Sequence, residues 1–127
     1  MDPKNLLLVA IGGALGASLR YLVILWIPTH NFPWSTLSVN LIGSFLLGII
    51  IGISSNQLLG EKSTLMIATG ILGAFTTMST YSIDTITLWE NDRFNAILYI
   101  LTTTIVGPLL ALIGIGTINS GIILKKF

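Results

Sequence analysis

Four long apolar stretches, separated by short polar connections, take up almost the whole of this 127-residue chain. They cover residues 5–27, 36–59, 64–89 and 96–124. An α-helix rises about 1.5 Å per residue, so roughly 20 apolar residues cross the ~30 Å hydrocarbon layer of a bilayer. Strands of a membrane β-barrel would be shorter and would alternate in polarity, which these stretches do not. The chain is therefore predicted to be an all-α integral membrane protein, one transmembrane domain over residues 1–127 with four transmembrane helices per subunit.

The composition excludes several classes of function. Only 9% of the residues are charged, against about a quarter in soluble domains, and the net charge of +1 comes without a basic cluster that could bind nucleic acid. The chain has no cysteine, which excludes thiol catalysis and cysteine metal sites. Its single histidine, His30, lies in a turn segment between prolines, so a nucleophile–histidine pair also lacks parts. We therefore predict that the protein is not an enzyme and that its surroundings are the lipid bilayer.

The distribution of basic residues predicts an orientation. Four spans place both termini on one side, and that side carries the lysines at positions 4, 62, 125 and 126, whereas Arg93, with Arg20 near it, marks the other side. The positive-inside rule then predicts that both termini are cytoplasmic, in the cell membrane.

Small residues predict how the spans pack. Gly12 and Gly16 form one G-x-x-x-G pair, Gly48 and Gly52 form another, and Gly43 extends the smooth face of the second span. In lipid such glycines mark close helix contacts. Four helices make a thin bundle with little interior, so we expect an oligomer.

A few polar residues lie inside the predicted spans, where they are costly. Arg20 is near the far end of the first span and could simply anchor the helix at the interface. Asn40, with Ser44 one turn later, needs a hydrogen-bond partner, which a contact between helices could supply.

The third span has the most unusual sequence. The segment 70–82 places two glycines and six hydroxyl side chains at the middle of a crossing, which predicts a break in the helix at mid-membrane. Non-helical backbone at that depth is tolerated only where protein buries it or where it lines a cavity, so the break marks a site. A continuous helix with back-bonded hydroxyls is the alternative. Asp84, just beyond, is expected to face a vestibule.

The fourth span carries a short polar face. Tyr99 and Thr103 lie one turn apart, but the same face continues to Gly107 and Ala111, so the row of hydroxyls stops midway. Pro108 is expected to kink the helix at that level.

Three motifs in order resemble the CrcB/Fluc fluoride channels, four-span proteins that work as antiparallel (inverted, dual-topology) dimers. They are residues 12–21, residues 36–43 and residues 70–82, and with the matching length and span number they cover essentially the whole chain. The resemblance implies a fluoride-selective channel that gives passive fluoride efflux, with pores at the dimer interface. It also implies a structural Na⁺ at the centre of the dimer, held through the backbone carbonyls of Gly73 and Thr76 of both subunits.

The resemblance assigns roles to individual side chains. Arg20 corresponds to the family's vestibule arginine, and Asp84 is placed in the vestibule with it. Met78 and Tyr81 align with two pore-lining phenylalanines of the family. The implied fluoride pore comprises Asn40, Ser44, Met78, Ser79, Thr80, Tyr81, Tyr99 and Thr103.

Several readings stay open. The lysine bias and the replacement at Met78 indicate either a homodimer or one half of a heterodimer with an oppositely oriented paralogue, in which this subunit could be a non-conducting structural partner. A small multidrug exporter is a weaker alternative, because such exporters need a membrane carboxylate in the first span, and Asp84 is the only candidate acid here.

Overall fold

The computed structural model describes residues 2–124, which form helices and connections without any strand. The long helical segments are α1 (Pro3–Trp26), α2 (Trp34–Ser55) and a column made of α6 (Arg93–Leu101), the π-helical η2 (Thr102–Val106) and α7 (Gly107–Leu124). The predicted all-α fold is confirmed for this part of the chain.

Three segments of the described chain are long and apolar enough to cross a membrane. They are Pro3–Trp26, Trp34–Ser55 and Arg93–Gly121, which correspond to the first, second and fourth predicted spans with ends shifted by a few residues. Large apolar side chains remain exposed along all three, as expected for surfaces that lipid covers. The chain is a multi-pass membrane protein.

The third predicted span is divided into two helical pieces. The first piece comprises α3 (Glu61–Thr64), the π-helical η1 (Leu65–Leu72) and α4 (Gly73–Phe75), and the second is α5 (Met78–Asn91). Between them Thr76 has a ψ of 158° and Thr77 a φ of −147°, so both residues are extended. Neither piece alone has the length of a membrane crossing. The depth of this interruption in the bilayer stays a prediction.

Glycines bring the helices into backbone contact. α2 packs along α7, and α1 packs along η1 and α4. A Cβ atom at Gly48 would overlap the carbonyl oxygen of Ala111, and one at Gly16 would overlap that of Ile71. The expectation that glycine pairs mark helix contacts is confirmed at both positions.

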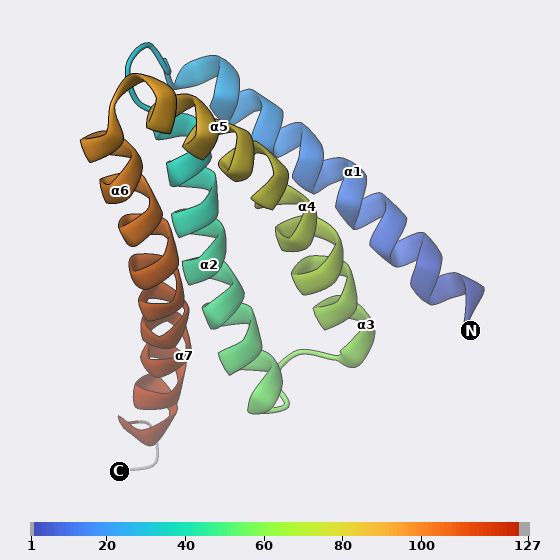
Figure 1. Cartoon of the computed structure of the whole chain (residues 1–127). Coiled ribbons are helices and arrows are strands. Elements are labelled where there is room, and N and C mark those ends of the chain that lie inside the picture. Colours follow the sequence, from blue (N-terminus) through green and yellow to red (C-terminus); the bar gives the residue numbers. More distant parts are fainter. Residues whose placement is uncertain (1, 125–127) are drawn as a thin grey trace.

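The two ends of the molecule differ. Figure 1 shows the start of α1 and the end of α7 at one end, opposite the α1–α2 connection and the α5–α6 turn. A small apolar cluster lies between α2, α5 and α6, and consists of Leu37, Tyr81, Leu88, Ala96 and Tyr99. Lys125 and Lys126, which contribute to the predicted orientation, lie outside the described residues.

Candidate functional site

The side chain of Asn40 bridges the interruption between α4 and α5. The backbone N–H of Thr77 donates to Asn40 Oδ1 at 2.8 Å, and Asn40 Nδ2 donates to the carbonyl oxygen of Thr77 at 3.1 Å. The Asn40 amide therefore satisfies both the N–H and the carbonyl of Thr77. Thr77 is only 6% exposed and lies between two helices, so its backbone has no helical hydrogen-bond partner. Because an unpaired polar group costs several kcal/mol in an apolar environment, this contact stabilises the interruption.

Thr77 also begins the helix that follows. Its Oγ1 accepts from the backbone N–H of Thr80 at 3.2 Å, which is the contact of an N-cap residue. The same hydroxyl donates to Thr80 Oγ1 at 3.1 Å and lies 3.3 Å from Ser79 Oγ. The hydroxyls of Thr77, Ser79 and Thr80 thus form one cluster at the start of α5.

These contacts divert the usual donors of two of the carbonyl groups at the interruption. In a continuous α-helix the Gly73 carbonyl would accept from the N–H of Thr77, and the Thr76 carbonyl from the N–H of Thr80. Both N–H groups are diverted, the first to Asn40 Oδ1 and the second to Thr77 Oγ1. The interruption therefore frees the carbonyl oxygens of Gly73 and Thr76.

The two free carbonyls fit a hard cation. Carbonyl oxygens are preferred ligands of such ions and need no proton to be lost. Within residues 2–124, no group of three or more His, Cys, Asp or Glu side chains could hold a metal ion. Gly73 is exposed, whereas Thr76 is half-buried.

The two residues aligned with the family's phenylalanines face different surroundings. Met78 is 72% exposed on the surface of α5, next to the exposed Ser79. Tyr81 is buried, and its ring centroid lies 5.1 Å from that of Tyr99. A single chain therefore brings only Tyr81 to the polar residues of the fourth span.

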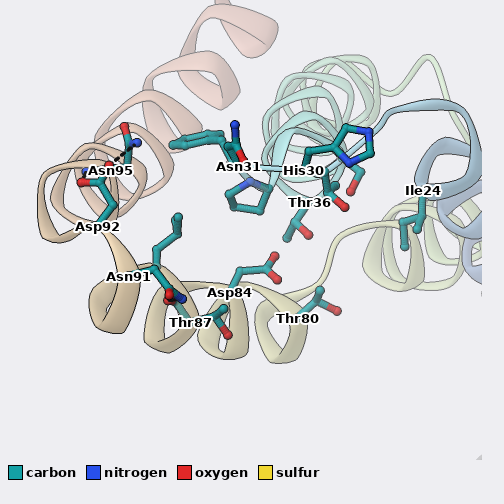
Figure 2. Close-up of a pocket in the computed structure, with 15 residues that line it drawn as sticks. Ile24, His30, Asn31, Thr36, Thr80, Asp84, Thr87, Asn91, Asp92 and Asn95 are labelled. Atoms are coloured by element: carbon teal, nitrogen blue, oxygen red, sulfur yellow. Dashed lines mark hydrogen bonds between the residues drawn. The ribbon is translucent and has the colours of Figure 1, made fainter.

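A polar cavity opens at the end of the molecule opposite the termini. It has a volume of about 830 Å³ and lies between the α1–α2 connection, the start of α2, and α5 with the turn that follows it. Figure 2 shows Asp84 pointing from α5 into this space, across from Thr36 of α2. Its polar wall includes Ser35, Thr36, Thr80, Asp84, Thr87 and Asn91.

The charges around the cavity are mainly negative. Asp84 and Asp92 contribute carboxylates and His30 an imidazole, but no lysine or arginine lines it. Arg20 is half-buried on α1, one turn before the lining residue Ile24, and does not line the cavity. The structure thus brings Asp84 and Thr80 to the cavity wall but leaves Arg20 outside it.

Tyr99 connects the cavity to the core. Its side chain is completely buried, and Phe32 packs edge-on against its ring with the centroids 5.6 Å apart. Its hydroxyl donates to Asp84 Oδ2 at 3.4 Å. A phenol has one proton to donate, so this contact occupies the donor of Tyr99.

The next hydroxyl along the fourth span has no partner. Thr103 Oγ1 is buried without a hydrogen bond among the described residues, which is rare for a buried polar atom. Thr103 belongs to the π-helical η2, directly before Gly107 and Pro108. On α2, Ser44 Oγ donates to the carbonyl oxygen of Asn40 at 2.7 Å.

Two residues of this site were not predicted individually from the sequence. Thr36 is buried at the cavity wall, and Thr77 is the residue that Asn40 holds. Thr36, Asn40 and Ser44 are spaced by four, so a polar stripe along α2 was visible in the sequence. The sequence does not show that Asn40 bonds to Thr77 rather than to Thr76, because the choice depends on how α2 contacts the helix break.

Comparison with known proteins places these residues in context. Residues 7–115 match the family model described as "CrcB-like protein, Camphor Resistance (CrcB)". A protein of Thermus thermophilus named "Fluoride-specific ion channel FluC" is 42% identical over 118 residues, which cover 90% of this chain and 93% of the relative.

Two further relatives have similar names. The "Fluoride-specific ion channel FluC" of Agrobacterium fabrum is 41% identical over 80% of this chain and 86% of its own length. The "Fluoride-specific ion channel FluC 2" of Bacillus subtilis is 46% identical over 84% of this chain and 82% of its own length.

Proposed function

Because this chain belongs to the CrcB-like protein family, we propose that it is a fluoride-selective channel that lets fluoride leave the cell passively across the cytoplasmic membrane. The observation that carries this conclusion is the identity of about 40% to relatives named fluoride-specific channels, over most of both chains. The resemblance seen in the sequence is thereby confirmed, as is the prediction that the protein is a channel and not an enzyme. A multidrug exporter is not supported.

The polar cavity is the proposed entrance for fluoride. Fluoride is small and strongly hydrated, so a selective path must replace its water with hydrogen-bond donors. Thr80 and Asp84 at the cavity wall lead to Tyr99, and the unpartnered hydroxyl of Thr103 lies one turn further along the fourth span. Of these groups, the hydroxyls of Thr80 and Thr103 are the neutral donors, which would suit fluoride better than the larger chloride.

The aromatic residues support a mid-membrane position for the helix break. Trp26, Trp34 and Trp89 are all exposed at the end opposite the termini, as expected for side chains at a membrane interface. From Thr77 to Trp89 the helix rises about 18 Å. Half of the hydrocarbon layer is about 15 Å, so the break would lie near its centre.

An inverted dimer would cover the exposed face of the break. Met78 is 72% exposed there, and Gly73 and Ser79 are exposed beside it. A second copy or a paralogue in the opposite orientation would bury these residues and bring Met78 to a pore at the interface. The dimer is therefore the assembly in which the predicted roles of Met78 and Ser79 become possible.

A structural Na⁺ between the two subunits fits the same face. The carbonyls of Gly73 and Thr76 would hold it, since neither retains its helical donor. Bound there, the ion would neutralise the partial negative charge of the carbonyl dipoles at the end of α4.

The partner in the dimer is either an identical chain or a paralogue. Lys4 and Lys62 lie at the end of the chain that holds the termini, and Arg93 at the other end, which favours one orientation with both termini in the cytoplasm. A chain with one orientation needs a partner with the opposite one to form an inverted dimer, and this chain could then be a structural subunit without a pore of its own.

Fluoride efflux from liposomes tests the proposal. The purified chain is reconstituted alone, and fluoride release is followed with an electrode after a potassium ionophore is added. We expect fluoride release and no comparable chloride release. Release only after an oppositely oriented paralogue is added would identify the heterodimer, and no release under either condition would contradict the channel function.

A further inference from the structure

The amide of Asn40 uses half of its hydrogen-bonding groups on the backbone at the helix break. An Asn amide offers two N–H donors and two acceptor lone pairs. One donor and one acceptor contact Thr77, at 3.1 and 2.8 Å. One N–H is left over, and it could contact a passing anion. The other N–H and the oxygen are used on the backbone, so the role of Asn40 is not confined to the pore.

The acceptor half of this contact determines what happens to the Gly73 carbonyl. The N–H of Thr77 is the donor that a continuous helix would deliver to Gly73. It points instead to Asn40 Oδ1 on a different helix. Without that acceptor, the N–H of Thr77 would be free to make the helical hydrogen bond to Gly73, which would continue α4 and occupy the Gly73 oxygen.

We propose that Asn40 is a positioning residue for the structural cation: its Oδ1 draws the Thr77 N–H away from Gly73 and so keeps the Gly73 carbonyl free to bind the ion. This inference rests on the cation site of the proposed function. It assigns to Asn40 a role separate from the pore-lining one implied by the family resemblance. The cation site and the fluoride path then share one side chain, so removal of the whole amide affects both.

Sodium-dependent stability tests this role independently of fluoride transport. Thermal unfolding of the purified full chain in its native oligomer is measured over a range of Na⁺ concentrations, with N-methylglucamine keeping the ionic strength constant. Binding of an ion to the folded state raises the Tm as its concentration exceeds the dissociation constant. The midpoint of this Tm increase reports the affinity for Na⁺.

Asn56 provides a matched control for Asn40. It directly follows α2 as its C-cap residue. Its amide also joins two helices, since its Nδ2 donates to Asn119 Oδ1 on α7 at 2.9 Å. We expect Asn40→Ala to move the Na⁺ midpoint at least tenfold higher, the usual scale for loss of a group that orients metal ligands. Asn56→Ala should lower the Tm at every concentration but leave the midpoint within twofold of the unmodified protein.

The other outcomes separate this inference from the proposed function. If Asn40→Ala leaves the midpoint within twofold, the positioning role is wrong even though the channel and its cation stand. If the unmodified protein does not respond to Na⁺ while it conducts fluoride, the cation site is wrong and this inference is overturned with it, but the channel function stands.

If Asn40→Ala does not fold, Asn40→Asp tests the positioning role of Asn40 instead. Aspartate keeps an oxygen that can accept from the Thr77 N–H but loses the donor to the Thr77 carbonyl. We expect this variant to respond to Na⁺ with an unchanged or lower midpoint. A tenfold higher midpoint would show that the acceptor alone does not free the Gly73 carbonyl, which would overturn the inference.

Discussion

In the proposed channel, the side chain of Asn40 would serve both the backbone and an ion. Its Oδ1 and Nδ2 hold Thr77 in an extended conformation, and its second N–H is not used by this contact. Replacing the amide by a carboxylate changes the charge with little change in shape. The two functions should therefore separate in a single variant.

We expect Asn40→Asp to suppress fluoride efflux from liposomes by at least tenfold, because it places a negative charge in the path of an anion. The Na⁺ dependence of the Tm should persist, as argued above. Unchanged efflux would remove Asn40 from the pore and leave it with the positioning role alone.

Met78 is the residue whose role depends most on a partner. Its side chain is 72% exposed, so replacement by phenylalanine should change the free energy of unfolding by less than about 0.5 kcal/mol. An aromatic ring offers a positively polarised edge to an anion, so Met78→Phe should preserve or raise fluoride efflux. Loss of efflux with intact assembly would mean that the alignment at this position is misleading.

Asp84 is a carboxylate at the wall of the proposed entrance. Two like charges about 4 Å apart in water repel by about 1 kcal/mol, which corresponds to about fivefold in a rate. Asp84→Asn keeps an oxygen that can accept from the Tyr99 hydroxyl, so we expect efflux to rise about fivefold.

Asp92→Asn is the control for this change. Asp92 also lines the cavity, but its two oxygens accept from the backbone and side chain of Asn95, at 3.1 and 2.9 Å. It should change efflux less than Asp84→Asn. Lower efflux from the Asp84 variant would instead indicate that its charge is required for conduction.

At the scale of the helices, glycines set how closely α2 and α7 approach. A Cβ atom at Gly48 would overlap the backbone of Ala111, whereas one at Gly116 on α7 would meet nothing within 4 Å. Backbone atoms cannot turn aside as a flexible side chain does, so the two helices would have to separate.

We therefore expect Gly48→Ala to lower the free energy of unfolding by about 1–3 kcal/mol, the usual cost of overpacking. Gly116→Ala should be neutral or slightly stabilising, because alanine favours the helix by up to about 1 kcal/mol. Unfolding in a denaturing detergent, followed by circular dichroism, measures both. Equal stability of the two variants would contradict the close contact.

The π-helical segments stand next to the two irregular regions of the chain. η1 (Leu65–Leu72) precedes α4 and the break, and η2 (Thr102–Val106) precedes Gly107 and Pro108. Pro108 has no N–H to donate to a carbonyl of the preceding turn, and that turn is widened into a π-helix. The kink at Pro108 stays a prediction. Such segments often occur at functional sites, which agrees with the unpartnered hydroxyl of Thr103 in η2.

At the scale of the whole molecule, the two ends differ in charge and in aromatic content. Exposed tryptophans gather at the end opposite the termini, and Arg93 lies over the ring of Trp89 there, 5.7 Å from its centroid. Lys4 and Lys62 lie at the other end. The tryptophans are typical of a membrane interface, and the distribution of lysine and arginine favours a single orientation in the membrane.

Reporter fusions at the C-terminus test the orientation. A reporter that is active only in the cytoplasm should be active in most molecules, and one that is active only outside the cytoplasm should be nearly silent. Comparable activity of both would indicate a dual-topology homodimer and would contradict the pairing with a paralogue.

Most of the architecture follows from the sequence, because lipid imposes two simple requirements. A span needs about 20 apolar residues, and each backbone polar group needs a partner within the protein. Length and hydropathy therefore predict four crossings, and the glycines and hydroxyls at 70–82 mark the crossing that the structure divides at Thr76 and Thr77.

The partners of the polar groups are decided only by the tertiary structure. The way the helices cross determines that Asn40 holds Thr77 and that Tyr99 donates to Asp84. It also determines that Met78 is exposed while Tyr81 is buried. Spacing along one helix predicts which residues share a face, but it contains no information on what lies opposite that face. Hydrogen bonds act over about 3 Å, so their partners are known only once the helices are packed.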